Sequence, residues 1–290
     1  MIVSSCEETV YIDGSESHKK IVINSIISTD STWNVNLSYS KSIFDVSEFT
    51  FIEHASTKVT NQTSGQSFFL KHKENGNYQR ALNPTEGHTY ELEVTTIDGK
   101  IARATTYVPS VLKVDVIKRD AFDSEGKATI ELEIEIEDNP TEENFYVWEV
   151  VENIYEELPE TPNNPTNVAT LPIELQKEDA DLKSLNSLLF ISDKNFDGTT
   201  YKTKLTLGQD VLAKVSGNNN GDEYQFQKPR FSLNVMAVSK DLYEYMRTYE
   251  IYKQTEIKIT SISQPVDVYS NIENGLGIFG GFNRKEFPIQ

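Results

Sequence analysis

The chain has 290 residues, of which 37% are hydrophobic and 25% charged, and its formal net charge is -18 at pH 7. The hydrophobic content predicts a packed core and argues against a disordered chain, and the length allows two domains. The negative charge argues against nucleic-acid binding, because phosphate contacts need clustered lysine and arginine, and against direct adsorption on an anionic bilayer.

Cys6 is the single cysteine of the chain and lies close to its start. An aliphatic residue three positions before a cysteine, with small residues directly before it, is typical of a bacterial lipoprotein cleavage site, and residues 3–5 supply this pattern. Acyl chains on Cys6 would hold the protein at a bilayer, because each buried methylene contributes about 0.8 kcal/mol. We therefore predict a covalent lipid on Cys6, no other cofactor, and a lipobox remnant with a tether over residues 1–19. No apolar run approaches the roughly 18 residues of a membrane-spanning helix, so any membrane link depends on Cys6.

The export signal before Cys6 is incomplete. A secretory signal has a charged start and about 7–15 apolar residues, whereas only residues 1–3 are apolar here. We expect either an upstream start codon or a chain that is recorded from a late position; the alternative is a free cysteine in a terminal segment. Glu7 and Glu8 resemble the acidic surface-export signal of Bacteroidota lipoproteins. The alternative for these two residues is a solvated acidic linker.

The first strand signals lie between residues 20 and 109. Residues 20–27 predict a buried strand, residues 33–39 alternate as in a half-buried strand, and shorter strands are expected near Val59 and at 68–70. After a turn at 82–88, two strands are predicted around Asp98-Gly99, a strong hairpin signal. Short strands without a helix predict a β-sandwich of immunoglobulin or fibronectin type over residues 20–109, with Tyr90 at the tyrosine-corner position.

A second set of strands is predicted downstream. Aliphatic residues alternate with glutamates over residues 130–137, which predicts a strand with one dry face and one acidic, wet face. Residues 145–151 are expected to form its antiparallel neighbour. Prolines over 156–172 indicate a surface loop or irregular insertion, and 217–223 reads as an exposed loop. Further strands are expected in the segments 111–117, 188–191, 201–207 and 231–235.

One helix is predicted near residues 239–254, with Ser239 as its cap and Asp241 in its first turn. Apolar and tyrosine side chains recur at helical spacing, and we expect this stripe to pack on a sheet; the alternative is a partner or sugar surface. The glycines of 270–281 predict tight turns that hold Leu276, Ile278 and Phe279 against the core. The expected fold is thus all-β and mostly antiparallel: the sandwich, then a larger β-rich domain over residues 110–290 with one late helix.

The sequence carries no motif that predicts catalysis. The four histidines lack metal-ligand spacing, and nucleophile elbows, phosphate loops and dinucleotide fingerprints are missing. We therefore predict neither an enzyme nor a metal centre. The weak exception is Asp193, Asn195 and Asp197, which match the first half of a calcium loop, although the twelfth position is Lys204. The alternative is a β-turn at 196–198.

Several segments together resemble a known family. They are the Cys6 motif and the segments 20–24, 84–92, 190–193, 196–198, 238–245 and 268–280. In order and spacing they resemble the Bacteroidota lipoproteins grouped as domain of unknown function 4249. The resemblance implies an outer-membrane lipoprotein found alongside TonB-dependent barrel transporters, and it supplies no catalytic site or ligand. The chain departs from the family in its short signal and in the stretch 156–172.

The leading hypothesis is a non-enzymatic, cell-surface-facing lipoprotein that acts as an accessory subunit of an outer-membrane β-barrel complex, for import or for export and assembly. Loops such as 156–172 and 217–223 would make the contacts. The alternative is a free-standing module that binds a glycan or another nutrient through Tyr243 and the 245–252 stripe, provided these face solvent. An enzyme would need a buried carboxylate pair or a metal.

Overall fold

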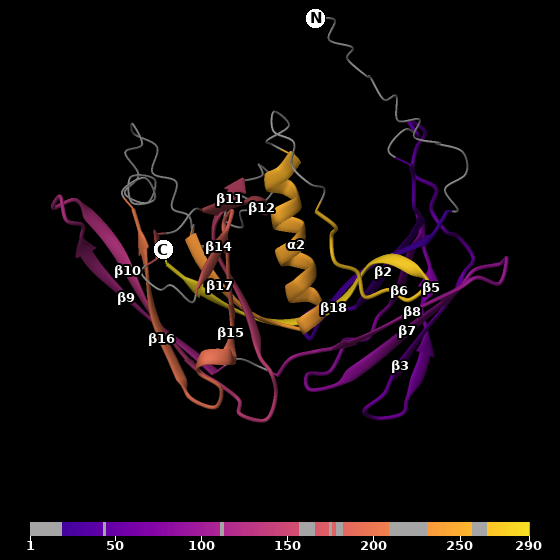
Figure 1. Ribbon diagram of the computed structural model, residues 1–290, viewed down its shortest axis with the longest axis horizontal. Coiled ribbons are helices and arrows are strands. Elements are labelled where there is room, and N and C mark those ends of the chain that lie inside the picture. Colours follow the sequence, from indigo (N-terminus) through magenta and orange to yellow (C-terminus); the bar gives the residue numbers. More distant parts are fainter. Residues whose placement is uncertain are drawn as a thin grey trace, which may run out of the picture.

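The computed structural model describes residues 19–42, 45–110, 113–156, 166–173, 176–177, 182–208, 231–256 and 266–289. This part of the chain forms antiparallel-rich β-sheets with a single α-helix late in the sequence, which confirms the predicted fold class (Figure 1). Among the described residues, no helix has the length and apolar character to cross a membrane. Residues 19–110 are called the N-terminal half below, and 113–289 the C-terminal half.

The N-terminal half contains eight strands. They are β1 (Ile21–Ser28), β2 (Trp33–Tyr39), β3 (Ser56–Asn61), β4 (Ser67–Phe69), β5 (Lys71–His72), β6 (Asn77–Arg80), β7 (Thr89–Thr95) and β8 (Ile101–Tyr107). The C-terminal half adds β9 (Lys113–Phe122), β10 (Ala128–Glu137), β11 (Phe145–Glu156), β12 (Thr166–Ile173), β13 (Gln176–Lys177), β14 (Lys183–Leu185), β15 (Leu188–Ser192), the 3-10 helix η1 (Asp193–Asn195), β16 (Thr200–Leu207), β17 (Phe231–Val238), α2 (Lys240–Glu256) and β18 (Gly275–Pro288).

The N-terminal half is a β-sandwich, as the sequence predicts. The strands β1, β2, β6 and β5 face the sheet β4-β3-β7-β8, and the two sheets share one hydrophobic core. Trp33 is 1% exposed and packs edge-on against Tyr90, with ring centroids 5.0 Å apart. The Tyr90 hydroxyl accepts a hydrogen bond from the Thr85 N–H at 2.8 Å, five residues upstream. This contact confirms the predicted tyrosine corner.

The predicted tight turns over the C-terminal glycines are wrong from Gly275 onward, because β18 is one continuous strand. It pairs in parallel with β1 and antiparallel with β17. A Cβ at Gly275 would lie 2.7 Å from the Ile21 carbonyl oxygen, and one at Gly280 would lie 2.8 Å from the Leu242 Cβ, so the glycines permit close packing rather than turning. Ile278 and Phe279 are buried as predicted, but Leu276 is 39% exposed.

β18 therefore carries one sheet through both halves of the molecule. The ten-stranded sheet runs β14-β15-β11-β17-β18-β1-β2-β6-β5, with β12 beside β11. The domain boundary between residues 109 and 110 stays a prediction, although the sheet and its hydrogen bonds cross it.

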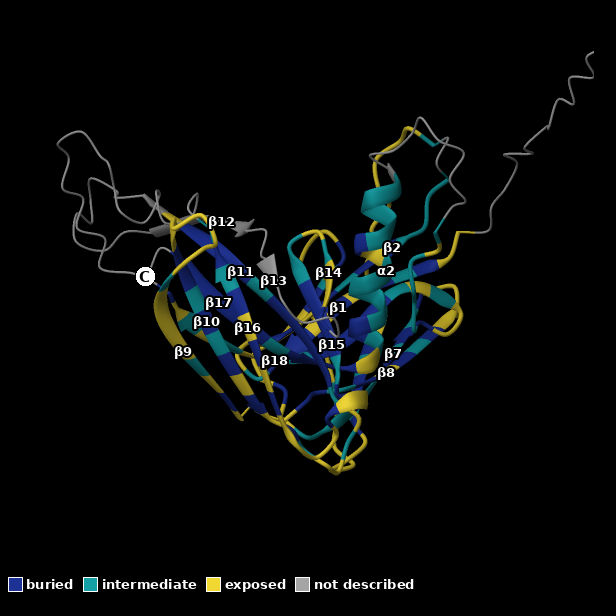
Figure 2. Cartoon of the chain, turned by 60° about the vertical axis from the view of Figure 1, so that its left-hand side comes forward, coloured by how far each residue is buried: buried dark blue, intermediate teal, exposed yellow. Residues whose placement is uncertain are grey.

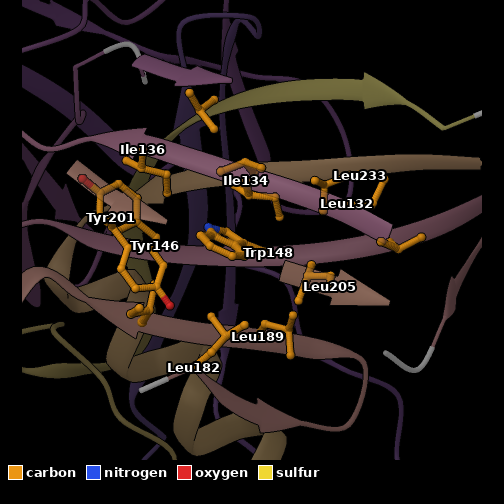
Figure 3. Close-up of a cluster of buried hydrophobic side chains, with 14 of the residues drawn as sticks. Leu132, Ile134, Ile136, Tyr146, Trp148, Leu182, Leu189, Tyr201, Leu205 and Leu233 are labelled. Atoms are coloured by element: carbon orange, nitrogen blue, oxygen red, sulfur yellow. The ribbon is translucent and has the colours of Figure 1, made fainter. Parts of the chain in front are cut away.

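The C-terminal half has its own core between this sheet and the sheet β13-β16-β10-β9. Trp148 of β11 is fully buried and lies among aliphatic side chains that include Ile134 of β10 and Leu205 of β16 (Figure 3). The predicted pairing of β10 with β11 is wrong: β10 pairs with β9 and β16, and β11 belongs to the facing sheet. The turn between them carries the chain from one sheet to the other.

The predicted dry face of β10 is confirmed, because its four aliphatic residues at positions 130, 132, 134 and 136 are at most 1% exposed. Its acidic face is lined by basic side chains from both neighbouring strands, so cross-strand ion pairs neutralise it. The pairs are Lys204–Glu131, Arg119–Glu133, Lys202–Glu135 and Lys113–Glu137, at 2.9, 3.1, 2.7 and 3.0 Å. Each pair is solvent-exposed and contributes little to stability.

Helix α2 covers the other face of the ten-stranded sheet, so β11 and β17 are buried on both sides (Figure 2). The Ser239 Oγ accepts a hydrogen bond from the Leu242 N–H at 3.3 Å, which confirms the predicted cap. Part of the predicted loop 156–172 is wrong, because β12 forms a strand paired with β11. Residues 157–165 and the predicted loop 217–223 lie outside the described residues.

Candidate functional site

The predicted lipid site lies outside the described residues: Cys6, Glu7 and Glu8 belong to the first 18 residues. The described residues start at Lys19, and two hydrogen bonds hold the next residue to the end of β2. The Lys20 N–H donates to the Ser40 Oγ at 2.9 Å, and the Ser40 N–H donates to the Lys20 carbonyl at 2.8 Å. The tether therefore joins the body beside the end of β2. The lipid and export signals stay predictions.

The weak calcium candidate forms part of an acidic cluster, but with a different membership. Asp193 and Asp197 come together with Asp138, and their carboxylate oxygens lie within 4.8 Å of one another. Asn195 lies between the two aspartates, at the end of the 3-10 helix η1. The chain turns here as the alternative interpretation predicts, with the Phe196 N–H donating to the Asp193 carbonyl at 2.7 Å and the Thr199 N–H to the Phe196 carbonyl at 2.8 Å.

Asp138 is the member that sequence reasoning missed. It directly follows β10 in a segment that reads as an ordinary turn, and it is 6% exposed. A carboxylate placed immediately after a strand with one fully buried face was the available signal, because buried carboxylates need partners. The pairing of β10 with β16 brings it beside Asp197, and the packing of the two sheets brings it beside Asp193, although these residues come 59 and 55 positions later in the chain.

The two buried carboxylates accept hydrogen bonds from the surrounding turns. Asp138 accepts from the Tyr146 hydroxyl at 2.7 Å and from the Gly198 N–H at 2.9 Å. Asp193 accepts from the Asn144 N–H. Burial raises the pKa of the Asp193 carboxyl above its ordinary value, the Asn144 hydrogen bond opposes this, and the charges of Asp138 and Asp197 add to it. Burial, with the Asp138 carboxylate beside it, also raises the pKa of the Tyr146 hydroxyl well above its usual range.

This arrangement allows two kinds of chemistry in principle. Three carboxylates are the ligands that hard cations such as calcium prefer, and a buried acid with a raised pKa is suited to proton donation. A general acid must reach its substrate, however, and Asp193 is 2% exposed and does not line the adjacent cavity. Asp138 does line it, but both its oxygens already accept hydrogen bonds. The geometry fits best a structural clasp that joins the 138–144 turn to the 193–199 turn.

The adjacent cavity has a volume of about 540 Å³ and lies where the two halves meet, between Tyr107 and Pro109 on one side and the 137–146 segment on the other. Its two lysines are engaged: Lys113 pairs with Glu137 at 3.0 Å and Lys240 with Glu143 at 3.1 Å. Both lysines of the wall thus already have acidic partners.

The tyrosine stripe of α2 divides between the core and the surface. Tyr243 is 8% exposed and packs on Phe145 and Phe190, with centroid distances of 5.1 and 5.5 Å, so it packs in the core as expected and does not meet the condition of the glycan alternative. Tyr249 is 41% exposed. Its ring stacks between Tyr245 and Tyr252, at 6.0 and 6.5 Å. Both faces of the Tyr249 ring, which could otherwise stack on a sugar, therefore contact neighbouring tyrosine rings.

Glu250 is a buried acid on the same helix. It is 6% exposed, and its carboxylate accepts a hydrogen bond from the Asn186 amide and pairs with Lys253 at 2.5 Å. The Asn186 bond joins α2 to the β14–β15 hairpin, and the Lys253 pair lies within the helix.

Comparison with known proteins gives a family. No curated protein matches this chain. The family described as domain of unknown function (DUF4249) matches residues 7–287, which span every element of the fold described above. The predicted family is thereby confirmed, and the chain belongs to the DUF4249 family.

Proposed function

We propose that this protein is a lipid-anchored, cell-surface-facing protein of the outer membrane that acts as a non-enzymatic accessory subunit of a β-barrel complex. The barrel would be a TonB-dependent transporter or an export and assembly machine. Three features support the proposal: the family match, the lipoprotein-like pattern around Cys6, and the segments that resemble the Bacteroidota lipoproteins of that family. The mechanism would be binding and positioning, with the lipid raising the effective concentration at the barrel.

The observation that carries this proposal is the continuity of the ten-stranded sheet. The tether joins the body beside β1 and β2, and β18 connects β1 directly to β17 in the C-terminal half. A body built on one hydrogen-bonded sheet holds its far surfaces at a fixed distance from the point where the tether joins it. Such rigidity suits a subunit whose role is to position a partner.

The acidic cluster supports a non-enzymatic role. Its two buried members are used by the Asn144 and Gly198 N–H groups and by the Tyr146 hydroxyl. Buried acids that satisfy turns in this way stabilise a fold and leave no free group directed at a substrate.

Affinity purification of the full chain from membranes in a mild detergent tests the proposal. The tagged chain should recover a β-barrel protein, and the matched Cys6→Ala variant, which lacks the acceptor for lipid, should recover none. Recovery of the anchored chain without any partner would contradict the accessory role.

A loop variant sharpens the same experiment. Residues 217–223 are replaced by a glycine-serine linker of equal length, which leaves Cys6 and every described strand intact. If this loop makes barrel contacts, the variant should stay in the membrane but recover less barrel protein. Undiminished recovery would remove this loop from the proposed contacts.

A glycan-binding module is the second candidate, and the exposure of Tyr249 on the stripe is the observation that favours it. The test is a glycan array with the full chain and its Tyr249→Ala variant. Binding that Tyr249→Ala abolishes would favour this candidate over the accessory role. Tyr243→Ala is not a suitable probe, because Tyr243 belongs to the core beneath the helix.

A further inference from the structure

Exposed apolar side chains gather at one end of the N-terminal half. Val46 is 99% exposed, Phe49 65% and Phe51 41%, and all three belong to the loop between β2 and β3. Ile97 at the tip of the β7–β8 hairpin is 78% exposed. These four residues are called the apolar tip below. Exposed apolar residues are unremarkable singly, but a group of them at one end indicates a surface that is covered by something.

Hydrogen bonds place the apolar tip beside the attachment of the tether. The Tyr39 N–H donates to the Thr50 carbonyl at 2.9 Å, so the loop leaves and rejoins the fold at the end of β2. The same end holds Lys20, through its bond to Ser40. The hairpin tip reaches this place from the facing sheet, since Tyr39, Phe51 and Ile97 line one shallow hollow.

The length of chain before the body keeps this end close to the anchor. Twelve residues lie between Cys6 and Lys19, so thirteen residue-to-residue steps join them. Fully extended, they span at most about 45 Å. A lipid on Cys6 would therefore hold the apolar tip nearer to the bilayer than the strands β9 and β10, which lie at the opposite end of the molecule (Figure 1).

The charge around the apolar tip also suits a lipid surface. In the segments 19–20, 40–53 and 96–100, four lysines balance four acids, although the net charge of the chain is -18. They are Lys19, Lys20, Lys41 and Lys100 against Asp45, Glu48, Glu53 and Asp98. The Lys41 Nζ lies 5.2 Å from the centre of the Phe49 ring. A lysine beside an apolar residue suits an interface, because its ammonium stays at the headgroups while the ring enters the acyl region.

We propose that the apolar tip inserts into the interfacial region of the bilayer to which Cys6 is attached, and so fixes the orientation of the body on the membrane. This inference rests on the proposed lipid anchor. Bilayer is favoured over a protein partner because Val46, Phe49 and Ile97 project from loop and hairpin tips. Projecting side chains enter lipid without a matching pocket, whereas a protein interface needs complementary packing.

Tryptophan fluorescence tests the proposal with the full chain. The chain is coupled through Cys6, its single cysteine, to a maleimide lipid in vesicles of phosphatidylethanolamine and phosphatidylglycerol with brominated acyl chains. One tryptophan is added by Val46→Trp, by Ile97→Trp, or by the control Phe122→Trp, which lies on β9 and is 75% exposed. Trp33 and Trp148 are 1% and 0% exposed, so they give a constant background.

The proposal predicts that bromine quenches most of the added emission at positions 46 and 97 and leaves position 122 unquenched. If positions 46 and 97 are not quenched in chains that float with the vesicles, the proposal is overturned. That is also the result expected if a protein, and not the bilayer, covers the apolar tip in cells. Failure of the proposed anchor is a separate result: it would appear as an unmodified Cys6 thiol in cellular material, and the chemically coupled chain would still report on insertion.

Discussion

Single buried polar groups hold the turns of this fold in place. The Tyr90 hydroxyl fixes the turn before β7, the Ser239 hydroxyl begins α2, and Asp138 and Asp193 join two turns of the C-terminal half. A buried polar group that loses its partner is costly, so these contacts are tested by removing one atom group at a time.

Removing the Tyr90 hydroxyl should weaken the sandwich. Tyr90→Phe keeps the packing on Trp33 but leaves the Thr85 N–H without its acceptor. The expected loss in the free energy of unfolding is about 1 kcal/mol, measured by urea denaturation. The control Tyr249→Phe changes an exposed ring and should leave the stability within about 0.5 kcal/mol of the parent. Equal effects at both positions would contradict a specific tyrosine corner.

Asp193 should make the stability depend on pH. Its raised pKa means that the folded state keeps a proton which the unfolded chain loses above the ordinary value of 3.8. The free energy of unfolding therefore receives a contribution that falls as the pH rises from that value through the folded-state pKa. Asp193→Asn removes this contribution and keeps an acceptor for the Asn144 N–H.

At neutral pH, Asp193→Asn should be at least as stable as the parent. Asp193→Ala leaves the Asn144 N–H unpaired and should cost about 1–3 kcal/mol. Thermal unfolding of the three proteins at pH 4 and pH 7 separates these effects. An asparagine variant that is as unstable as the alanine variant would show that the negative charge itself is required, as in a cation site.

At the scale of elements, β18 is the strand on which both halves depend. It lies between β1 and β17, and α2 crosses it at Gly280, where a Cβ would lie 2.8 Å from the Leu242 Cβ. Glycine is required there by packing against the helix, not by the backbone conformation of a turn.

Gly280→Ala should therefore destabilise the protein through overpacking, by about 1–3 kcal/mol in denaturant unfolding. Gly208→Ala is the matched control, because a Cβ there meets nothing within 4 Å. That change should be neutral or slightly stabilising, since alanine lowers the entropy of the unfolded chain. A neutral Gly280→Ala would contradict the close packing of α2 on β18.

The elements that the sequence predicted well are those with one clear period. β10 reads correctly because its buried and exposed faces alternate residue by residue, and the capped start of α2 is a local signal. β18 was missed because its glycines mimic turn signals, and part of β12 because prolines occur in its segment. The predicted neighbour of β10 was wrong because the next strand along the chain, β11, belongs to the facing sheet.

The candidate site shows the same limit. Residues 193–198 were recognised as a possible oxygen-rich loop, but the real partner, Asp138, comes from another element. Sequence spacing cannot reveal which acids of the 45 in the chain become neighbours. The apolar tip could likewise not be predicted, because Ile97 and Phe51 come together only after two sheets have packed.

At the scale of the whole molecule, the shared strand couples two cores. Each half has a separate hydrophobic cluster, yet both clusters depend on the sheet that β18 completes. The protein should therefore unfold in a single cooperative transition. Coincident curves from tryptophan fluorescence and far-ultraviolet circular dichroism would agree with this, and two resolved transitions would indicate independent domains.

The proposed function and the proposed membrane orientation both depend on the acyl anchor at Cys6. Mass spectrometry of the N-terminal peptide from native outer-membrane fractions tests it most directly. We predict a peptide that begins at Cys6 and carries diacylglycerol on sulfur and a further acyl chain on the amine. An unmodified Cys6 thiol, in protein recovered free of membranes, would contradict the account.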